Sequence, residues 1–162
     1  MSDFYLARSK LAPLSPLNPR FDAIESEVVG EHVLLTRVRG HVTRALTEQQ
    51  FIQFRHLVVG AGQPVWIIEQ LELTGFDPGA VAAGARWFSN FKDRGGERII
   101  VVSTHPAARM AAASLAFAVH AKISSCNTLQ AAYEQAGLGQ IEVRPSKYSL
   151  SPRPGDAPLS RR

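Results

Sequence analysis

The sequence has a single cysteine, Cys126, among its 162 residues, and it has no paired Cys or His spacing typical of a zinc site. One cysteine cannot form an intrachain disulfide, which favours a reducing compartment. No apolar run approaches the roughly 20 residues that a membrane-spanning helix needs, and residues 1–14 lack the uninterrupted apolar segment of a secretory signal. These absences predict a soluble, cytoplasmic protein with no metal, no cofactor and no membrane span.

Motifs of catalytic and phosphate-binding sites are missing as well. The five histidines are scattered, with no HxH or HExxH spacing that would place two ligands on one metal ion. The turn TGFDPG, residues 74–79, has neither GxGxxG nor GxxxxGK[ST] spacing, and Asp77 in it would repel a phosphate. Cys126 lies in the segment ISSC, where we interpret it as a buried small side chain rather than a nucleophile. The sequence therefore predicts a protein that is not an enzyme.

The formal net charge is +4, but the excess of basic residues lies at the two ends of the chain. Residues 25–137 hold ten basic and ten acidic side chains, which argues against a nucleic-acid-binding groove on this segment. Residues 1–24 and 138–162 are rich in proline, as extended arms are. We expect one domain at 25–137, between two arms that either keep the protein soluble or dock onto an acidic partner or a membrane surface.

Apolar residues follow strand and helix patterns in turn. Alternation within 26–42 indicates two short strands. The following helices are expected to stop at the glycines of 60–62 and 95–96, and Thr47 is expected to cap a turn of the first helix. The expected order after the first two strands is helix 43–59, strand 64–73, helix 78–94, strand 98–103, helix 106–121, strand 122–126 and helix 128–136. This order predicts an α/β fold with a mostly parallel or mixed sheet of four to five strands flanked by about four helices.

The segment IIEQLELTGFDPGAVAAGARWFSNFKDRGGERIIVVSTHP, residues 67–106, resembles the core of the STAS domain. STAS domains form the fold of bacterial anti-sigma-factor antagonists and stressosome proteins. The resemblance covers about residues 26–137: an apolar strand ends at a turn, a helix ends in Gly-Gly, a strand follows, and the next helix opens near a proline. It implies a STAS-like fold and a regulatory role in binding other proteins.

The STAS resemblance also marks the turn that precedes the helix at 78–94. In the family an Asp-Ser-Ser-Gly sequence stands there, and a partner kinase phosphorylates a serine at the helix N-terminus. Here Asp77 matches the family's Asp, whereas Pro78 and Gly79 occupy the serine positions. The resemblance therefore implies a partner-binding edge without the usual phosphoacceptor, and Thr74 is the nearby hydroxyl that could replace it.

Two strand-to-helix turns, at Asp77 and at His105, are expected to open on the same edge of a parallel sheet. We expect the Asp77 carboxylate to cap its helix by accepting backbone N–H groups. Ser103 or Thr104 is expected to cap the following helix. Arg109 and His105 could join Asp77 in a small polar site, so an enzyme built on these three residues is a further alternative.

The helices at 78–94 and 106–121 carry more apolar surface than a sheet can cover. Trp87 and Phe88 are neighbours and differ by about 100° around the helix axis, so we expect one of them to lie at a contact surface. The next helix is apolar nearly all the way round, and we expect Met110, Phe117 and Ala113 to cover the sheet. Its opposite face then suits an internal packing site or a protein interface.

These observations predict a non-catalytic, STAS-like regulatory or scaffold protein without the usual phosphorylatable serine. The expected partners are a regulatory kinase, an anti-sigma-type protein, a scaffold or a second copy of the chain, and not nucleic acid. The expected binding residues lie in the two apolar helices and the turns before them: Thr74, Asp77, Gly79, Trp87, Phe88, His105 and Arg109. The alternative function is a small-ligand or lipid-binding domain, because some relatives of this fold enclose an apolar pocket.

Overall fold

The computed structural model describes residues 22–139, so the two predicted arms lie almost entirely outside the described residues. Every strand and helix expected from the sequence is present, and β3 extends three residues beyond its expected end. The elements are β1 (Ala23–Val29), β2 (Val33–Val42), α2 (Arg44–Ala61), β3 (Val65–Phe76), α3 (Pro78–Asp93), β4 (Arg98–Val102), α4 (Pro106–Ala118), β5 (Lys122–Cys126) and α5 (Leu129–Gln135).

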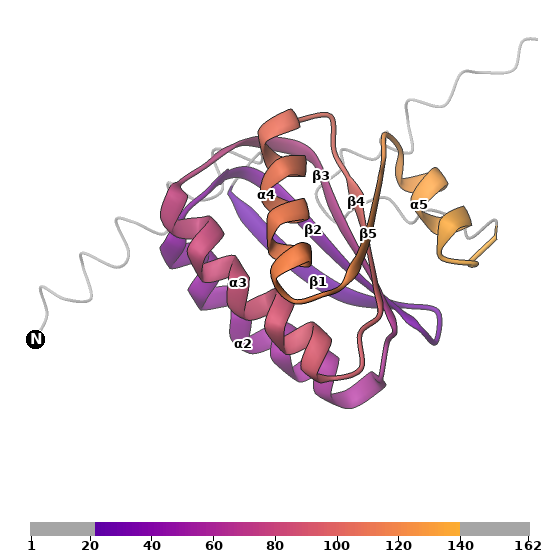
Figure 1. The fold of residues 1–162 in the computed structure, drawn as a ribbon. Coiled ribbons are helices and arrows are strands. Elements are labelled where there is room, and N and C mark those ends of the chain that lie inside the picture. The colour runs from indigo at the N-terminus through magenta and orange to yellow at the C-terminus, as the bar shows by residue number, and fades with distance from the viewer. Residues whose placement is uncertain (1–21, 140–162) are drawn as a thin grey trace, which may run out of the picture. The chain divides into compact units, whose positions relative to one another are not determined.

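The five described strands form one mixed sheet in the order β1-β2-β3-β4-β5 (Figure 1). β1 and β2 are antiparallel and are joined by a short turn, in which Gly30 has a φ of +64°. The other neighbouring pairs are parallel, because a helix crosses over between each strand and the next. The prediction of an α/β fold with a mixed sheet is confirmed.

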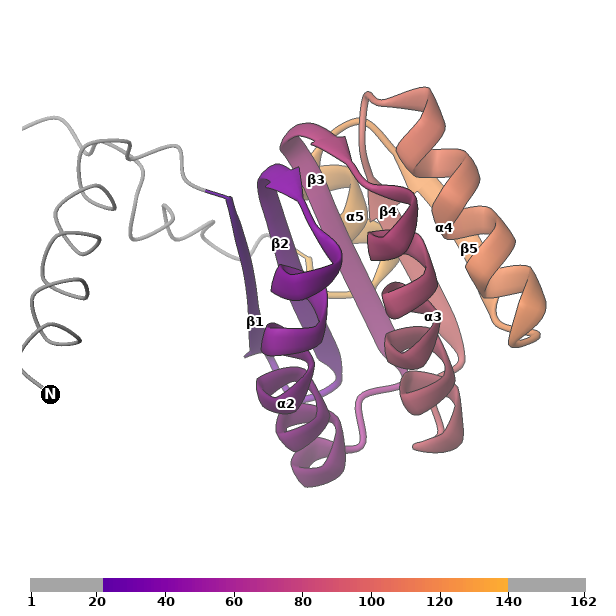
Figure 2. The ribbon, with the colours of Figure 1, turned by 90° about the vertical axis from the view of Figure 1, so that its left-hand side faces the viewer.

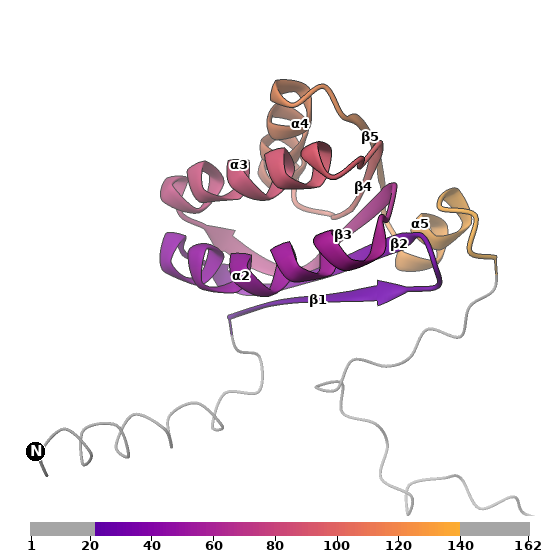
Figure 3. The same ribbon diagram turned by 90° about the horizontal axis from the view of Figure 1, so that it is seen from below.

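Helices cover both faces of this sheet. α2, α3 and α4 lie together on one face (Figure 2), and α5 lies on the other (Figure 3). Successive side chains of a strand point to opposite faces, so Trp66 and Ile68 of β3 pack in the core under α2, α3 and α4. Ile67, between them, packs with Tyr133 of α5 in a smaller second core. Both faces of the central strands are therefore buried.

Aromatic side chains from α2, β3 and α3 fill the larger core. The Trp87 ring of α3 has its centroid 4.4 Å from that of Phe54 of α2, and its Nε1–H donates to the carbonyl of Thr47 at 3.2 Å. The ring of Phe88 lies 5.0 Å from the Trp66 ring of β3. Because burying one large apolar side chain contributes about 1.5–3 kcal/mol, this cluster is a main source of stability.

The helix ends are set by polar caps and glycines. The Oγ1 of Thr43 caps α2 by accepting the N–H of Leu46 at 3.1 Å. Thr47 does not have the predicted capping role: its hydroxyl donates to the carbonyl of Thr43 at 2.9 Å, because the helix begins one turn earlier. Gly62, with a φ of +54°, ends α2, and Gly95, with a φ of +91°, follows α3, as the glycine pattern predicted.

Candidate functional site

The turn between β3 and α3 places Asp77 at the N-cap position of α3, but its carboxylate makes no hydrogen bond to the helix. Asp77 Oδ1 lies 2.7 Å from Nε2 of His41, at the end of β2. His41 is paired with Gly75 in the β2–β3 register, and a Cβ on Gly75 would lie 3.1 Å from His41 Nδ1. The missing side chain of Gly75 leaves room for the imidazole to reach Asp77. The predicted capping bond is therefore wrong, and His41 joins the site without having been predicted.

The positions that carry serines in STAS domains lie in the first turn of α3, which begins at Pro78. A Cβ on Gly79 would lie 3.2 Å from Cβ and 3.3 Å from Cδ of Arg44. The Nε of Arg44 donates to Glu48 Oε1 at 2.8 Å, which holds this side chain along α2. Thr74 is exposed near the end of β3. The first turn of α3 thus offers no hydroxyl group, and the side chain of Arg44 packs against it.

The turn between β4 and α4 places His105 at the N-cap position of α4. Its Nδ1 accepts the N–H of Ala108 at 3.3 Å, and its ring centroid lies 6.0 Å from that of Phe76 at the end of β3. The Oγ of Ser103 accepts the backbone N–H of His105 at 3.1 Å. Ser103 and Thr104 are therefore not the cap, contrary to prediction, because the helix begins at residue 106 and the cap position falls on the histidine.

Arg109 links the first turn of α4 to the ends of β4 and β5. Its Nε donates to the carbonyl of Ser103 at 2.6 Å. Its Nη2 donates to Asn127 Oδ1 and to the carbonyl of Cys126, the latter at 3.4 Å. Arg109 and Asp77 thus have separate partners instead of the shared polar site that the sequence left open. In this structure Arg109 positions α4 on the sheet.

Trp87 and Phe88 are both buried, with 4% and 5% of their surface exposed. The prediction that one of them faces outward is wrong. Helix α3 packs against α2 as well as against the sheet, so its buried face is wide enough for two neighbours about 100° apart. Trp87 packs on Phe54 of α2, and Phe88 packs on Trp66 of the sheet. These two aromatic residues support the fold beneath any contact surface.

Helix α4 turns its small residues toward the sheet, where the buried positions are Ala108, Ala112 and Ala116. Met110 and Phe117, which we expected to cover the sheet, are 71% and 82% exposed. Alanines four residues apart share one face of the helix and let its backbone approach the sheet closely, which leaves Met110 and Phe117 on the outer face. Ala113 is exposed too, again contrary to prediction. We call the exposed face formed by Met110, Ala113, Ser114 and Phe117 the α4 surface.

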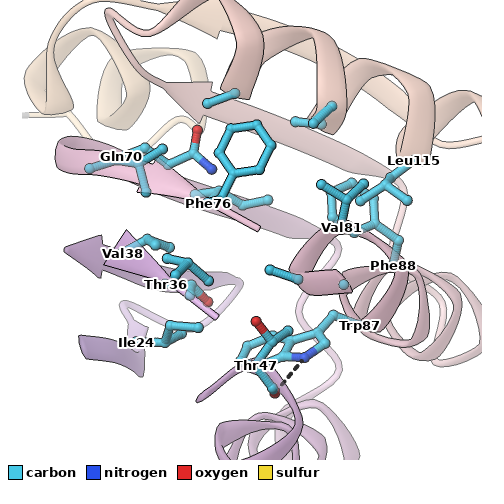
Figure 4. Close-up of a pocket in the computed structure, with 18 of the residues that line it drawn as sticks. Ile24, Thr36, Val38, Thr47, Gln70, Phe76, Val81, Trp87, Phe88 and Leu115 are labelled. Atoms are coloured by element: carbon cyan, nitrogen blue, oxygen red, sulfur yellow. Dashed lines mark hydrogen bonds between the residues drawn. The ribbon is translucent and has the colours of Figure 1, made fainter. Parts of the chain in front are cut away.

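A pocket of about 120 Å³ lies between the sheet and helices α3 and α4 (Figure 4). Its lining is mostly aliphatic and aromatic, and it includes Trp66 and Trp87. Gln70 of β3 also lines it, and the Oε1 of this side chain is buried without a hydrogen-bond partner. The fold therefore combines an exposed apolar helix face with an apolar pocket beneath the same helix.

Glu69 of β3 and Cys126 of β5 have shifted pKa values. Burial raises the pKa of the Glu69 carboxyl group, although its Oε1 accepts the N–H of Leu71 at 2.8 Å. Desolvation likewise raises the pKa of the Cys126 thiol. Cys126 is partly buried rather than fully buried as predicted, because it lies on the edge strand β5. Since the thiolate is the reactive form, a raised pKa favours a structural cysteine over a nucleophile.

The described part of the chain has neither a metal-ion cluster nor a helix that could cross a membrane. Residues 22–139 contain no group of three or more His, Cys, Asp or Glu side chains placed to hold a metal ion. No helix among these residues is both long and apolar enough to cross a membrane.

The sequence matches no family model and no curated protein. The structure, by contrast, is similar to that of the anti-sigma factor antagonist SpoIIAA in its unphosphorylated form, with a TM-score of 0.56 over 71% of this chain and 98% of that chain, at 16% identity. This chain has the SpoIIAA-like fold. The fold is the one that the STAS resemblance implied, and that expectation is confirmed.

Two further solved structures share the SpoIIAA-like fold. One is the Bacillus cell fate determinant SpoIIAA in the phosphorylated form, with a TM-score of 0.54 over 70% of this chain and 98% of that chain, at 18% identity. The other is an uncharacterized protein of the DUF3478 family from Shewanella loihica PV-4, with a TM-score of 0.56 over 70% of this chain and 92% of that chain, at 16% identity. An anti-sigma factor antagonist and an uncharacterized protein thus share this arrangement of strands and helices. The fold alone therefore does not give the function, which depends on the site.

Proposed function

We propose that this protein is a non-catalytic protein-interaction domain, a regulatory or scaffold protein, which binds a protein partner through the α4 surface and the adjoining strand-to-helix turns. The observation that carries the proposal is the exposure of Met110 and Phe117 on one face of α4, at 71% and 82%. Seven residues span about two helical turns, so the two side chains lie on the same side, about 10 Å apart along the axis.

The chemistry of the α4 surface supports a protein partner. Covering a large apolar side chain contributes about 1.5–3 kcal/mol, and aromatic residues and methionine are enriched at protein interfaces. Ala113 and Ser114 between the two large side chains are small, so a partner segment can approach the helix backbone there. Residues 25–137 carry balanced charge, which favours an apolar protein groove over a nucleic acid as the complementary surface.

The turns beside α4 complete the proposed contact region. The ends of parallel strands β3 and β4 open on one edge of the sheet, where Asp77, paired with His41, and His105 provide polar groups. Gly79 lies in the same turn as Asp77 and has no hydroxyl group to accept a phosphate. We therefore propose that phosphorylation at the first turn of α3 does not switch this protein, and that exposed Thr74 is the hydroxyl a kinase could reach instead.

We propose the class of partner from the similarity of this fold to that of proteins with a known type of partner. SpoIIAA, whose structure is similar to that of this chain, is an anti-sigma factor antagonist. The partners we propose are therefore a regulatory kinase, an anti-sigma-type protein or a scaffold protein, with a second copy of this chain as the partner in self-association.

A double variant, Met110→Ser with Phe117→Ser, tests the proposal. The matched control is Ile52→Ser, which changes a 64% exposed residue on α2. Sedimentation velocity measures self-association, and a pull-down with the tagged chain measures retention of partner proteins. We expect the double variant to lose these contacts and the control to keep them. Equal association of all three proteins, with unchanged circular dichroism, would contradict the proposal.

A further inference from the structure

The pocket between the sheet, α3 and α4 exists because the helices carry small side chains above it. On α3 these are Ala80 and Gly84, and on α4 they are Ala108, Ala111 and Ala112. Larger side chains at these positions would fill the space above β2 and β3. The pocket is thus built into the sequence of two helices rather than created by one loop.

Aromatic rings form much of the wall of this pocket. Trp66, Trp87, Phe88 and Phe76 all line it, together with aliphatic side chains. Phe76 is partly exposed, as are Val81 and Leu115 on the two helices, so part of the pocket wall reaches solvent. An apolar pocket with few polar groups is the usual form of a small-molecule site.

The polar side chains in the lining are satisfied by the protein, apart from Gln70. Thr36 Oγ1 accepts the indole N–H of Trp66 at 2.9 Å, and Thr47 Oγ1 donates to the carbonyl of Thr43 at 2.9 Å. Of the buried side-chain atoms without a partner in residues 22–139, Gln70 Oε1 is the one that belongs to a pocket-lining residue. Figure 4 shows the Gln70 carboxamide beside the Phe76 ring. An unpaired buried oxygen is unfavourable, so a bound hydrogen-bond donor would relieve it.

We propose that this pocket binds a compact, largely aromatic molecule that carries one hydroxyl group, with the hydroxyl donating to Gln70 Oε1. The volume of about 120 Å³ approaches that of engineered cavities of about 150 Å³, which bind benzene. A hydroxyl suits the site because it both donates and accepts, as a carboxamide does. The proposal is independent of the α4 surface, because the pocket lies on the sheet side of that helix.

The test compares phenol with toluene, which have nearly the same shape and differ in the hydroxyl group. Both tryptophans of the chain line the pocket, so their two indole N–H signals in a ¹⁵N-labelled NMR spectrum report on its occupancy. We expect saturable shifts with phenol and an affinity for phenol at least equal to that for toluene. In an apolar cavity without an acceptor, phenol would bind more weakly, since its hydroxyl would be buried unpaired.

Three variants locate the ligand. Gln70→Leu removes the acceptor, and it should weaken phenol binding about tenfold while toluene binding is kept. Ala111→Leu fills the pocket and should abolish binding of both, whereas Ala113→Leu makes the same change on the exposed side of α4 and should leave binding intact.

The proposal is overturned if wild-type protein gives no saturable shifts, if it prefers toluene to phenol, or if Gln70→Leu leaves the phenol affinity unchanged. It is also overturned if folded Ala111→Leu protein binds phenol as the wild type does. If Ala111→Leu loses its folded NMR spectrum, the comparison of wild type with Gln70→Leu decides the question alone.

Discussion

Helices α3 and α4 follow each other along the chain and are both apolar, yet they use their apolar residues in opposite ways. In α3 the large side chains are inside: Trp87, Phe88 and Phe91 are buried. In α4 three alanines, Ala108, Ala112 and Ala116, are inside, and Met110 and Phe117 are exposed. The apolar content of a helix therefore does not tell which side chains form the core.

The difference follows from what each helix packs against. α3 lies against the sheet and against α2, so large side chains are needed to fill the space between three elements. α4 packs against β4 and β5 at the edge of the sheet, where alanines bring the helix close to the strands (Figure 2). Leu115 still packs against the core from one side of α4, but Met110 and Phe117 lie on the opposite face and are available to a partner.

The largest expected effect comes from removing a large side chain of α3. Trp87→Ala should lower the free energy of unfolding by about 3–5 kcal/mol, because it leaves a cavity beside Phe54 and removes the hydrogen bond to the carbonyl of Thr47. Phe117→Ala, an aromatic truncation on α4, should change it by less than about 0.5 kcal/mol. Urea denaturation measures both. A cost of several kcal/mol for Phe117→Ala would show that this ring is buried in solution.

A smaller effect is expected from enlarging the alanines of α4. Ala116 is fully buried and does not line the pocket, so Ala116→Leu should cost about 1–3 kcal/mol through overpacking. Ala113→Leu places the same side chain on the exposed face, and alanine and leucine have similar helix propensities, so its cost should be near zero. Thermal unfolding of the two variants checks the orientation of α4. Similar melting temperatures would contradict it.

The sequence was sufficient to predict the order of the elements and the class of fold. Strand and helix periodicities are strong local signals, and glycines such as Gly62 and Gly95 stop helices through a left-handed backbone that other residues rarely adopt. The STAS resemblance then selected one α/β arrangement, which the comparison of structures confirmed.

The site was harder to predict because its contacts depend on tertiary structure. His41 reaches Asp77 because β2 and β3 pair in a register that places it beside Gly75, and no local pattern contains this information. The orientation of α4 was predicted wrongly, because a helix that is apolar all round has no single apolar stripe that identifies the face toward the core. The signal that could have corrected this prediction was side-chain size, because Ala108, Ala112 and Ala116 place a small residue at every fourth position of one face.

The smallest expected changes in the free energy of unfolding come from the residues at the N-termini of the same two helices. His105 caps α4 through a hydrogen bond to its own helix, so His105→Ala should cost about 1 kcal/mol, with little dependence on salt.

Asp77 makes no such bond to α3. Its carboxylate acts through the helix dipole and through His41, and both side chains of that pair are about half exposed. Asp77→Ala should therefore cost less than about 1 kcal/mol at low ionic strength, and this cost should shrink in 1 M NaCl, where the screening length is about 3 Å. Urea denaturation at the two salt concentrations measures it, and His41→Ala combined with Asp77→Ala gives the coupling between the two residues. If the stability cost of Asp77→Ala persists at high salt, the carboxylate caps α3 through a hydrogen bond in solution. That result would contradict the structure, in which Asp77 makes no such bond.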